Sequence, residues 1–345
     1  MEATILGLDY PTLWFLVVGG LFAGYAILDG FDFGAGAWHL FFKKEESRRI
    51  ALNAVGPVWD GNEVWLVIGG GALFAGFPIV YATLFSGLYV PFMLFIFSLI
   101  FRAISIEFRS KETMLWWRKT WDISYSISSI LLATLLGVVL GNVLQGLPIG
   151  KDGQLQMSLF EVLNPFSIVI GITTLALFMM HGGIYLIMKT EGRLFAKIGI
   201  LTKRSVWIFV ALFAVSTTYV LLYIPHLSNG FKENPVLSII PFLGMLSIAN
   251  IPRLLSKKNF FRAFIFSAIS IALFLFVVAI ELYPSILISS IDPSYDISIY
   301  DAASSEKTLG IMLFMAAIGT PIILTYTIFV YKTFKGKVRL DETSY

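Results

Sequence analysis

The chain has 345 residues, of which 57% are hydrophobic and only 14% are charged. This composition excludes an ordinary soluble domain and indicates an integral membrane protein. The lack of cysteine excludes disulfides, thiolate metal sites and iron–sulfur clusters. The net charge of +3 is not accompanied by any motif for nucleic-acid binding.

Apolar runs follow one another along the whole chain, and most reach the length of about 20 residues that a helix needs to cross the hydrocarbon. They predict nine transmembrane helices, at residues 13–41, 50–75, 77–101, 121–145, 162–188, 206–225, 236–252, 262–283 and 308–331. The first run has no basic segment before it and no small-residue cleavage site, so we expect a retained helix rather than a signal peptide. No linker divides the chain, which predicts a single polytopic domain over residues 1–345.

The basic residues are distributed unevenly between the connections. Of the 25 Lys and Arg residues, 22 lie in alternate connections and in the C-terminal tail, and only Lys151, Lys232 and Lys307 lie in the others. Loops rich in Lys and Arg stay in the cytoplasm, so the N-terminus is expected outside and the C-terminus in the cytoplasm. The outside connection at 284–306 has four acidic residues and two prolines, which is typical of a solvated loop.

Acidic residues occur inside the first two predicted helices. The denser polar motifs lie in residues 14–166, whereas residues 167–331 are largely apolar. Asp29 and Asp32 are three residues apart, as are Asp60 and Glu63, so each pair shares one helical face. A carboxylate near the middle of the bilayer costs at least about 2.5–3.5 kcal/mol unless it is paired, protonated or hydrated.

Two interpretations of these acids compete. In the first, they pair with Arg102, Asn62, tryptophan indoles or backbone amides and lock the helices together. In the second, they line a hydrated path for protons from the cytoplasm, because a carboxyl group in an apolar site favours its protonated form and can pass the proton on. The two interpretations are balanced for Asp60, while packing is favoured for Asp29 and Asp32 and a structural role is expected for Glu63.

Two further charged residues lie near the inner boundary. Arg102 ends the third apolar run, where an arginine commonly extends to the interface, but its apolar neighbours favour a partly buried site. Asp122 is expected to begin the fourth helix. It is either a charge favoured by the helix dipole or the partner of Arg102.

Three histidines are the candidates for binding a haem iron. His39 and His226 are expected at the two membrane interfaces, and His181 lies within a helix. A lone helical histidine is more often hydrogen-bonded than ligated, so the chain shows no evident ligand set for a redox centre of its own. Glycines at 30, 34, 36 and 69–71 are expected to serve close helix packing, since no phosphate-loop motif accompanies them.

A series of motifs then follows in one fixed order. The runs are Asp29–Gly36, Arg48-Arg49, Gly56–Trp65, Gly69–Ala75, Phe77–Ala82, Phe85–Tyr89, Phe101-Arg102, Phe108–Ser110, Trp117-Arg118, Trp121-Asp122, Gly141–Gly146 and Leu163–Phe166. Together they resemble subunit II of the cytochrome bd-type quinol oxidases. The likeness is dense over residues 24–166 and rests on order and spacing beyond them.

The resemblance implies a nine-helix subunit made of two four-helix bundles and a peripheral helix, paired with a similarly folded subunit I in the bacterial cell membrane. The complex would oxidise quinol and reduce O2 to water, building a proton gradient without pumping. Subunit I would hold two b-type haems and haem d, and this chain would bind no haem. Further expected associations are the lipid bilayer, a small single-helix subunit and, as in some members, a structural quinone.

The resemblance also implies a role for particular residues. Trp59 and Asp60 match the family's Trp-Asp motif, and the other buried charged positions correspond to Asp29, Asp32, Arg102 and Asp122. These residues would form a cytoplasmic proton path or a buried polar network that stabilises the partner, and no catalytic or metal-binding residue is expected here.

Two other functions compete with the oxidase subunit. The first is a proton-coupled secondary transporter, whose mid-membrane acids would bind the coupling ion, although no helix is expected to break at corresponding points of two halves. The second makes this chain itself the haem carrier, through His181.

Overall fold

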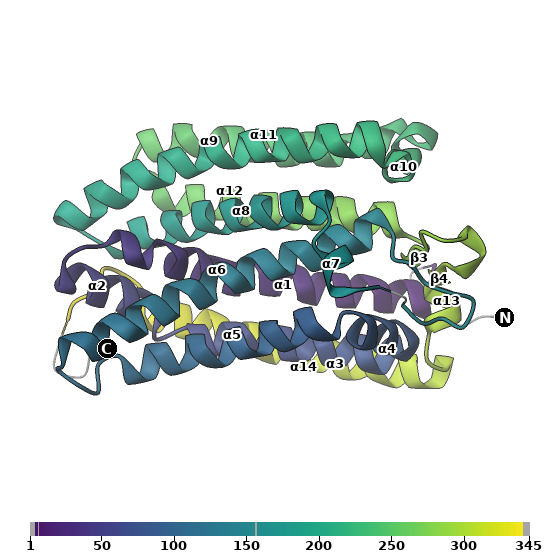
Figure 1. The fold of residues 1–345 in the computed structure, drawn as a ribbon, viewed down its shortest axis with the longest axis horizontal. Coiled ribbons are helices and arrows are strands. Elements are labelled where there is room, and N and C mark those ends of the chain that lie inside the picture. The colour runs from purple at the N-terminus through teal and green to yellow at the C-terminus, as the bar shows by residue number, and fades with distance from the viewer. Residues whose placement is uncertain (1–3, 6, 156, 341–345) are drawn as a thin grey trace.

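The computed structural model describes residues 4–5, 7–155 and 157–340. Long helices run side by side along the longest axis of the molecule (Figure 1). They are α1 (Tyr10–Trp38), α3 (Trp59–Gly76), α5 (Tyr89–Phe108), α6 (Leu115–Gln145), α8 (Pro165–Lys189), α9 (Gly192–Tyr223), α11 (Ile239–Ser256), α12 (Phe260–Leu282) and α14 (Glu306–Thr333). The described part of the chain is therefore almost entirely helical, as the apolar runs predict.

Short elements connect the long helices. The helical ones are η1 (His39–Phe41), α2 (Glu45–Val55), α4 (Pro78–Gly87), α7 (Leu159–Val162), η2 (Pro225–Ser228), α10 (Asn229–Glu233), η3 (Pro235–Ser238), η4 (Pro293–Tyr295) and α13 (Ile299–Ala302). The strands are β1 (Thr4–Ile5), β2 (Leu8–Asp9), β3 (Ser285–Leu287) and β4 (Ile297–Ser298), paired antiparallel as β1–β2 and β3–β4.

Eight helices of the described chain are long and apolar enough to cross a membrane. A ninth crossing would combine α3 with the short α4, which are bent by 117° relative to each other. The bend lies at Phe77, whose backbone is not helical and which precedes Pro78, the first residue of α4. This bend coincides with the predicted boundary between the runs 50–75 and 77–101, but the prediction of one helix over 77–101 is wrong, because that run is divided at Leu88 between α4 and α5. The described residues contain only one such bent pair, so no break recurs at corresponding points of two halves.

The second predicted run, 50–75, is also divided. Helix α2 ends at Val55, and α3 begins only at Trp59. Pro57 lies in the gap and has no N–H group to continue the hydrogen-bond ladder of α2. The charged helix α2 thus lies outside the apolar part of the bundle, at one end of it (Figure 1).

Two helices begin well before their predicted starts, because hydropathy marks only the apolar part of a helix. Helix α6 begins at Leu115 and α9 at Gly192, each with a polar first segment. Asp122 consequently lies inside α6, and its prediction as a helix-start charge is wrong.

The loop at 284–306 is more ordered than a solvated loop. Its strands β3 and β4 bury Leu287 and Ile297, and Ile299 is also fully buried. The loop lies at the end of the bundle where α1 begins, opposite α2 and the C-terminal segment (Figure 1). The consecutive apolar residues 286–288, together with Ile297 and Ile299, were the sequence signal for this order.

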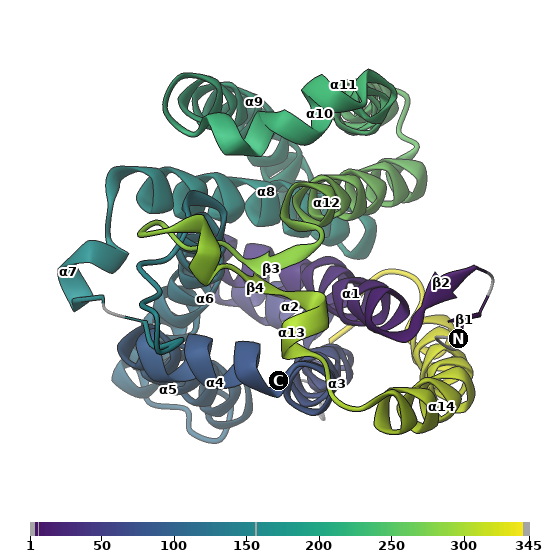
Figure 2. The same ribbon diagram turned by 90° about the vertical axis from the view of Figure 1, so that its right-hand side faces the viewer.

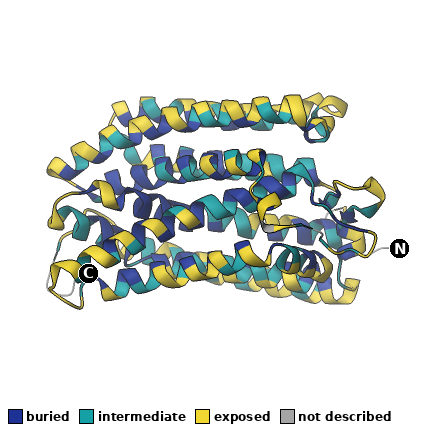
Figure 3. Ribbon diagram, in the orientation of Figure 1, coloured by how far each residue is buried: buried dark blue, intermediate teal, exposed yellow. Residues whose placement is uncertain are grey.

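Helix α1 forms the centre of the molecule. Seen along the bundle, α9 and α11 form one row, α8 and α12 the next, α6 and α1 a third, and α5, α3 and α14 the last (Figure 2). Every residue from 29 to 39 is buried, whereas the outer rows expose much of their surface (Figure 3). Exposed apolar side chains cover α14, whose most apolar stretch has no buried residue.

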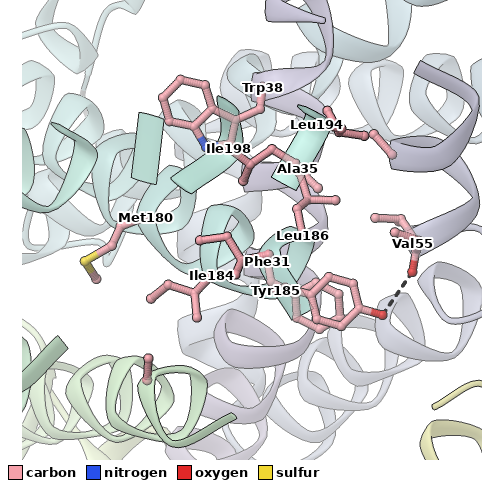
Figure 4. Close-up of a cluster of buried hydrophobic side chains, with 14 of the residues drawn as sticks. Phe31, Ala35, Trp38, Val55, Met180, Ile184, Tyr185, Leu186, Leu194 and Ile198 are labelled. Carbon is pink, nitrogen blue, oxygen red and sulfur yellow. Dashed lines mark hydrogen bonds between the residues drawn. The ribbon is translucent and has the colours of Figure 1, made fainter. Parts of the chain in front are cut away.

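The largest apolar cluster joins α1 to α8 and α9. Phe31 of α1 stacks on Tyr185 of α8 with ring centres 4.0 Å apart, and Ile198 of α9 packs nearby (Figure 4). The hydroxyl of Tyr185 donates to the backbone oxygen of Ala54, at 2.9 Å. This contact ties the end of α2 to the same core.

Close approach of α1 and α8 depends on Gly34. A Cβ atom built there would lie 1.8 Å from the backbone oxygen of Phe178. Helix packing in membranes commonly uses small residues in this way, so the predicted packing role is confirmed for Gly34. Gly70 and Gly71 have open space beside them within this chain, so for them the packing role stays a prediction.

We expect Gly34→Ala to lower the melting temperature of the purified protein, because the two backbones must separate and overpacking costs about 1–3 kcal/mol. Gly20→Ala on the same helix is the control, since nothing lies within 4 Å of a Cβ atom at that position. Equal melting temperatures for the two variants would contradict the packing role.

Candidate functional site: two buried ionic clusters

Arg102 organises the polar centre of the bundle. Its fully buried guanidinium contacts both oxygens of Asp29, with Nη2–Oδ1 at 2.7 Å and Nη1–Oδ2 at 3.2 Å. The same Nη1 donates to Oε1 of Glu63 at 2.8 Å, and Nη2 lies 3.7 Å from Oδ2 of Asp32. One guanidinium from α5 thus holds two acids of α1 and one of α3.

Asp32 is held mainly by an amide. Nδ2 of Asn62 donates to Oδ2 of Asp32 at 2.8 Å and to the Leu28 backbone oxygen at 3.2 Å. The hydroxyl of Tyr331, on α14, donates to Oδ1 of Asn62 at 3.0 Å. We call Asp29, Asp32, Asn62, Glu63, Arg102 and Tyr331 the central cluster. It connects α1, α3, α5 and α14.

The two acids of α3 have different surroundings. Glu63 reaches Arg102, yet 22% of its side chain is exposed. Asp60, three residues earlier, is exposed on the surface of the chain and has no ion pair within the described residues. Trp59 beside it is buried. The shared helical face places Asp60 and Glu63 near each other, but only Glu63 joins the central cluster.

A second cluster surrounds Asp122. Oδ1 of Asp122 accepts from Nε of Arg109 at 2.6 Å and from Nε2 of His39, and Oδ2 accepts from Nη1 of Arg48 at 2.9 Å. Arg109 also forms two hydrogen bonds with Glu45, of 2.9 and 3.2 Å. We call His39, Glu45, Arg48, Arg109, Arg118 and Asp122 the end cluster, since it lies where α2 meets α5 and α6.

The end cluster corrects one expectation. Asp122 is not the partner of Arg102, because its oxygens are taken by Arg48, Arg109 and His39. His39 lies at the end of α1, as expected, and is fully buried within the chain. Burial by itself would lower the pKa of Arg109, but its hydrogen bonds with Asp122 and Glu45 raise that pKa above its usual value, so the guanidinium stays charged.

The sequence alone did not single out Arg48, Arg109 or Tyr331 as part of a site. The two arginines lie in basic connections, where a solvated side chain is the ordinary expectation. Arg109 is buried and Arg48 is 23% exposed, because α2 brings Glu45 and Arg48 to Arg109 and Asp122, a contact that hydropathy does not report. The aromatic residue before Arg109 was the available hint.

The histidines are occupied by other contacts. Nδ1 of His181 lies 2.7 Å from the hydroxyl of Ser267, and its Nε2 lies 3.0 Å from the backbone oxygen of Ile27. Nε2 of His226 lies 3.0 Å from the backbone oxygen of Leu144. Within the described residues, no group of three or more His, Asp and Glu side chains is arranged to hold a metal ion. For His181, the mid-helix candidate, neither ring nitrogen is left without a hydrogen-bond contact.

Comparison with known proteins identifies the family. A family model described as cytochrome bd terminal oxidase subunit II matches residues 10–334. The chain belongs to this family. It is accordingly a subunit of a cytochrome bd-type terminal oxidase, an oxidoreductase complex, as its motifs predict.

Individual relatives align with nearly the full length of this chain. Cytochrome bd-I ubiquinol oxidase subunit 2 of Escherichia coli (strain K12) is 33% identical over 370 residues, covering 97% of both chains. Cytochrome bd ubiquinol oxidase subunit 2 of Bacillus subtilis (strain 168) is 32% identical, covering 96% of this chain and 97% of the relative. A solved chain of the bd oxidase from Geobacillus thermodenitrificans shares the fold, with a TM-score of 0.79, 17% identity and coverage of 94% and 98%.

We expect Arg102→Met to prevent stable accumulation of this subunit or to lower its melting temperature strongly. Removing one partner of a buried ion pair costs about 3–5 kcal/mol, because the remaining charge stays buried. Arg118→Met is the control, since its pair with Glu45 is partly exposed and such pairs contribute about 0–1 kcal/mol. The measurements are membrane abundance and thermal unfolding, and a normal Arg102→Met protein would contradict the central role of this guanidinium.

Proposed function

We propose that this chain is the non-haem subunit II of a bd-type quinol oxidase in the bacterial cell membrane. The complex oxidises quinol and reduces O2 to water, and it builds a proton gradient without pumping. This chain stabilises the haem-bearing subunit I and supplies protons from the cytoplasm. The observation that carries the proposal is the central cluster, a set of acids buried in a chain whose mid-helix histidine, His181, is hydrogen-bonded at both ring nitrogens.

The charge balance of the central cluster suits proton transfer. Three carboxyl groups, those of Asp29, Asp32 and Glu63, surround the single guanidinium of Arg102. Fully ionised, the cluster would carry two uncompensated negative charges in a medium of low dielectric, which is strongly unfavourable. A shared proton relieves this cost, so the cluster can accept and release protons without a change of fold.

The exposed Asp60 marks the face that subunit I covers. A carboxylate facing lipid costs about 2.5–3.5 kcal/mol at mid-membrane depth, and a polar partner removes that cost. On the same helix Val67 is 72% exposed and Phe74 59% exposed, so α3 presents an apolar surface around the acid. Glu63 lies between this face and Arg102, which makes α3 the exit from the central cluster to the partner.

The orientation of the chain in the membrane follows from the distribution of its Lys and Arg residues. Counting α3 and α4 as one crossing, nine spans form a single polytopic domain of two four-helix bundles with α14 at the periphery, the N-terminus outside and the C-terminus in the cytoplasm. The end cluster and α2 then lie on the cytoplasmic side, and the acidic loop with β3 and β4 lies outside, in agreement with the uneven distribution of Lys and Arg.

The haems, two of b type and one haem d, belong to subunit I, where they would supply the electron transfer and O2 chemistry. A structural quinone, unlike the haems, would bind to this chain. An apolar cavity of about 330 Å³ lies between α1, α3, α5, α6 and α12, lined by residues such as Phe15, Phe92 and Leu136. Its lining suits an isoprenoid tail rather than a polar headgroup.

Purification of this chain tests its place in the complex. We expect a haem-bearing second subunit to co-purify in a stoichiometric amount, because the exposed Asp60 on the apolar surface of α3 would otherwise face lipid. His181→Ala should leave the reduced haem spectrum unchanged, since both ring nitrogens of His181 are already hydrogen-bonded within the chain. A haem-free chain without a partner, or haem loss on His181→Ala, would contradict the proposal.

Asp60→Asn tests the proton path. Asparagine keeps the size of the side chain but cannot carry a proton, so O2 consumption should fall by about tenfold or more while haem content and subunit ratio persist. Asp152→Asn, in an exposed turn at the other end of the bundle, is the control and should be neutral. Full turnover in assembled Asp60→Asn enzyme would leave Asp60 with a packing role only.

A further inference from the structure

Tyr125 lies between the two ionic clusters. It follows Asp122 by three residues on α6, and its side chain is almost completely buried. Its hydroxyl has no hydrogen-bond partner within the described residues. A buried polar group without a partner costs about 1–3 kcal/mol, so an unpaired hydroxyl in this position calls for an explanation.

A glycine on α1 fixes where this hydroxyl lies. A Cβ atom built on Gly36 would come within 3.2 Å of Cζ of Tyr125, the ring carbon that carries the oxygen. Gly36 is four residues after Asp32 and three before His39, so all three positions lie on one face of α1. The phenol ring of Tyr125 therefore lies beside the turn of α1 that separates Asp32 from His39.

Both of these neighbours also have an unpaired atom. Oδ1 of Asp32 and Nδ1 of His39 are fully buried and have no hydrogen-bond partner within the described residues. The rings of His39 and Tyr125 meet edge to face with centres 5.1 Å apart. Three unpaired polar atoms thus lie between the end cluster and the central cluster, and buried polar atoms of this kind are commonly bridged by ordered water.

We propose that the hydroxyl of Tyr125 relays protons from the end cluster to the central cluster. The inference rests on the proton path proposed above and specifies where that path enters the membrane. Protons arrive from the cytoplasm at Glu45, whose side chain is 43% exposed, and pass through Asp122 and His39. The relay ends at Asp32, from which Arg102 and Glu63 lead to the exposed face of α3.

The chemistry of the step is balanced without an ionised phenol. A hydroxyl group can donate one hydrogen bond and accept others at the same time. Tyr125 releases its proton toward Oδ1 of Asp32 while it receives the Nδ1 proton of a doubly protonated His39, directly or through a bridging water. One O–H bond of the phenol breaks as another forms, and His39 returns to its neutral form with its Nε2–H still on Asp122, so Tyr125 is unchanged afterwards.

Tyr125→Phe in the complete oxidase is the direct test. Phenylalanine keeps the ring against Gly36 and His39 and removes only the oxygen. We expect turnover to fall by about tenfold and the solvent deuterium isotope effect on turnover to increase, because proton delivery becomes rate-limiting. Haem content, subunit ratio and melting temperature should match those of the unmodified enzyme.

Tyr185→Phe is the matched control. Tyr185 is equally buried, but its hydroxyl donates to the backbone oxygen of Ala54 and lies outside the relay. Its loss removes a satisfied hydrogen bond, so this variant should be at least as destabilised as Tyr125→Phe while keeping its turnover and isotope effect.

The outcomes separate the relay from the proposed function. Normal turnover and an unchanged isotope effect in Tyr125→Phe overturn the relay, and so does equal slowing of both tyrosine variants. If Tyr125→Phe turns over normally while Asp60→Asn is slow, only the relay is overturned, and the proton path proposed above is retained with a different entry point for protons. If Tyr125→Phe and Asp60→Asn both show full turnover, the relay and the proton path are both overturned.

Discussion

The buried guanidinium of Arg102 is the interaction on which the rest of the structure depends. It is permanently charged and completely removed from solvent, so it requires acids around it. Asp29 and Glu63 supply contacts of 2.7–2.8 Å, and they come from two other helices. The relative positions of α1, α3 and α5 are therefore determined by one side chain, because any other arrangement leaves a buried charge without a partner.

Small residues make the same arrangement possible on the opposite side of α1. Gly34 allows the backbone of α8 to approach α1, and Gly36 leaves room for the ring of Tyr125. The acids of α1 can therefore face α3 and α5 while Gly34, on the opposite side of the helix, faces α8. A helix with buried charges on one side and a close helix contact on the other has neighbours all round, and residues 29–39 are accordingly buried without exception.

The polar groups of the chain fall into two kinds, those that could bind a metal and those that could carry a proton. His181 is hydrogen-bonded at both ring nitrogens, and one nitrogen of His39 binds Asp122. Groups that could move a proton, by contrast, lie in the end cluster, in the central cluster and at Tyr125 between them. This arrangement agrees with the supporting and proton-supplying role that we propose for the chain.

The sequence by itself determined the membrane class, the approximate helices and the family, because apolar length, Lys and Arg bias and ordered motifs are local properties. It also indicated that the acids of the first half require partners. Only the tertiary structure decided which partners they have: Asp29 meets Arg102, 73 residues away, Asp122 meets Arg109 rather than Arg102, and Asp60 faces outward. The physical reason is that the rotation of each helix about its axis, and the neighbour it then meets, depend on the packing of all helices together.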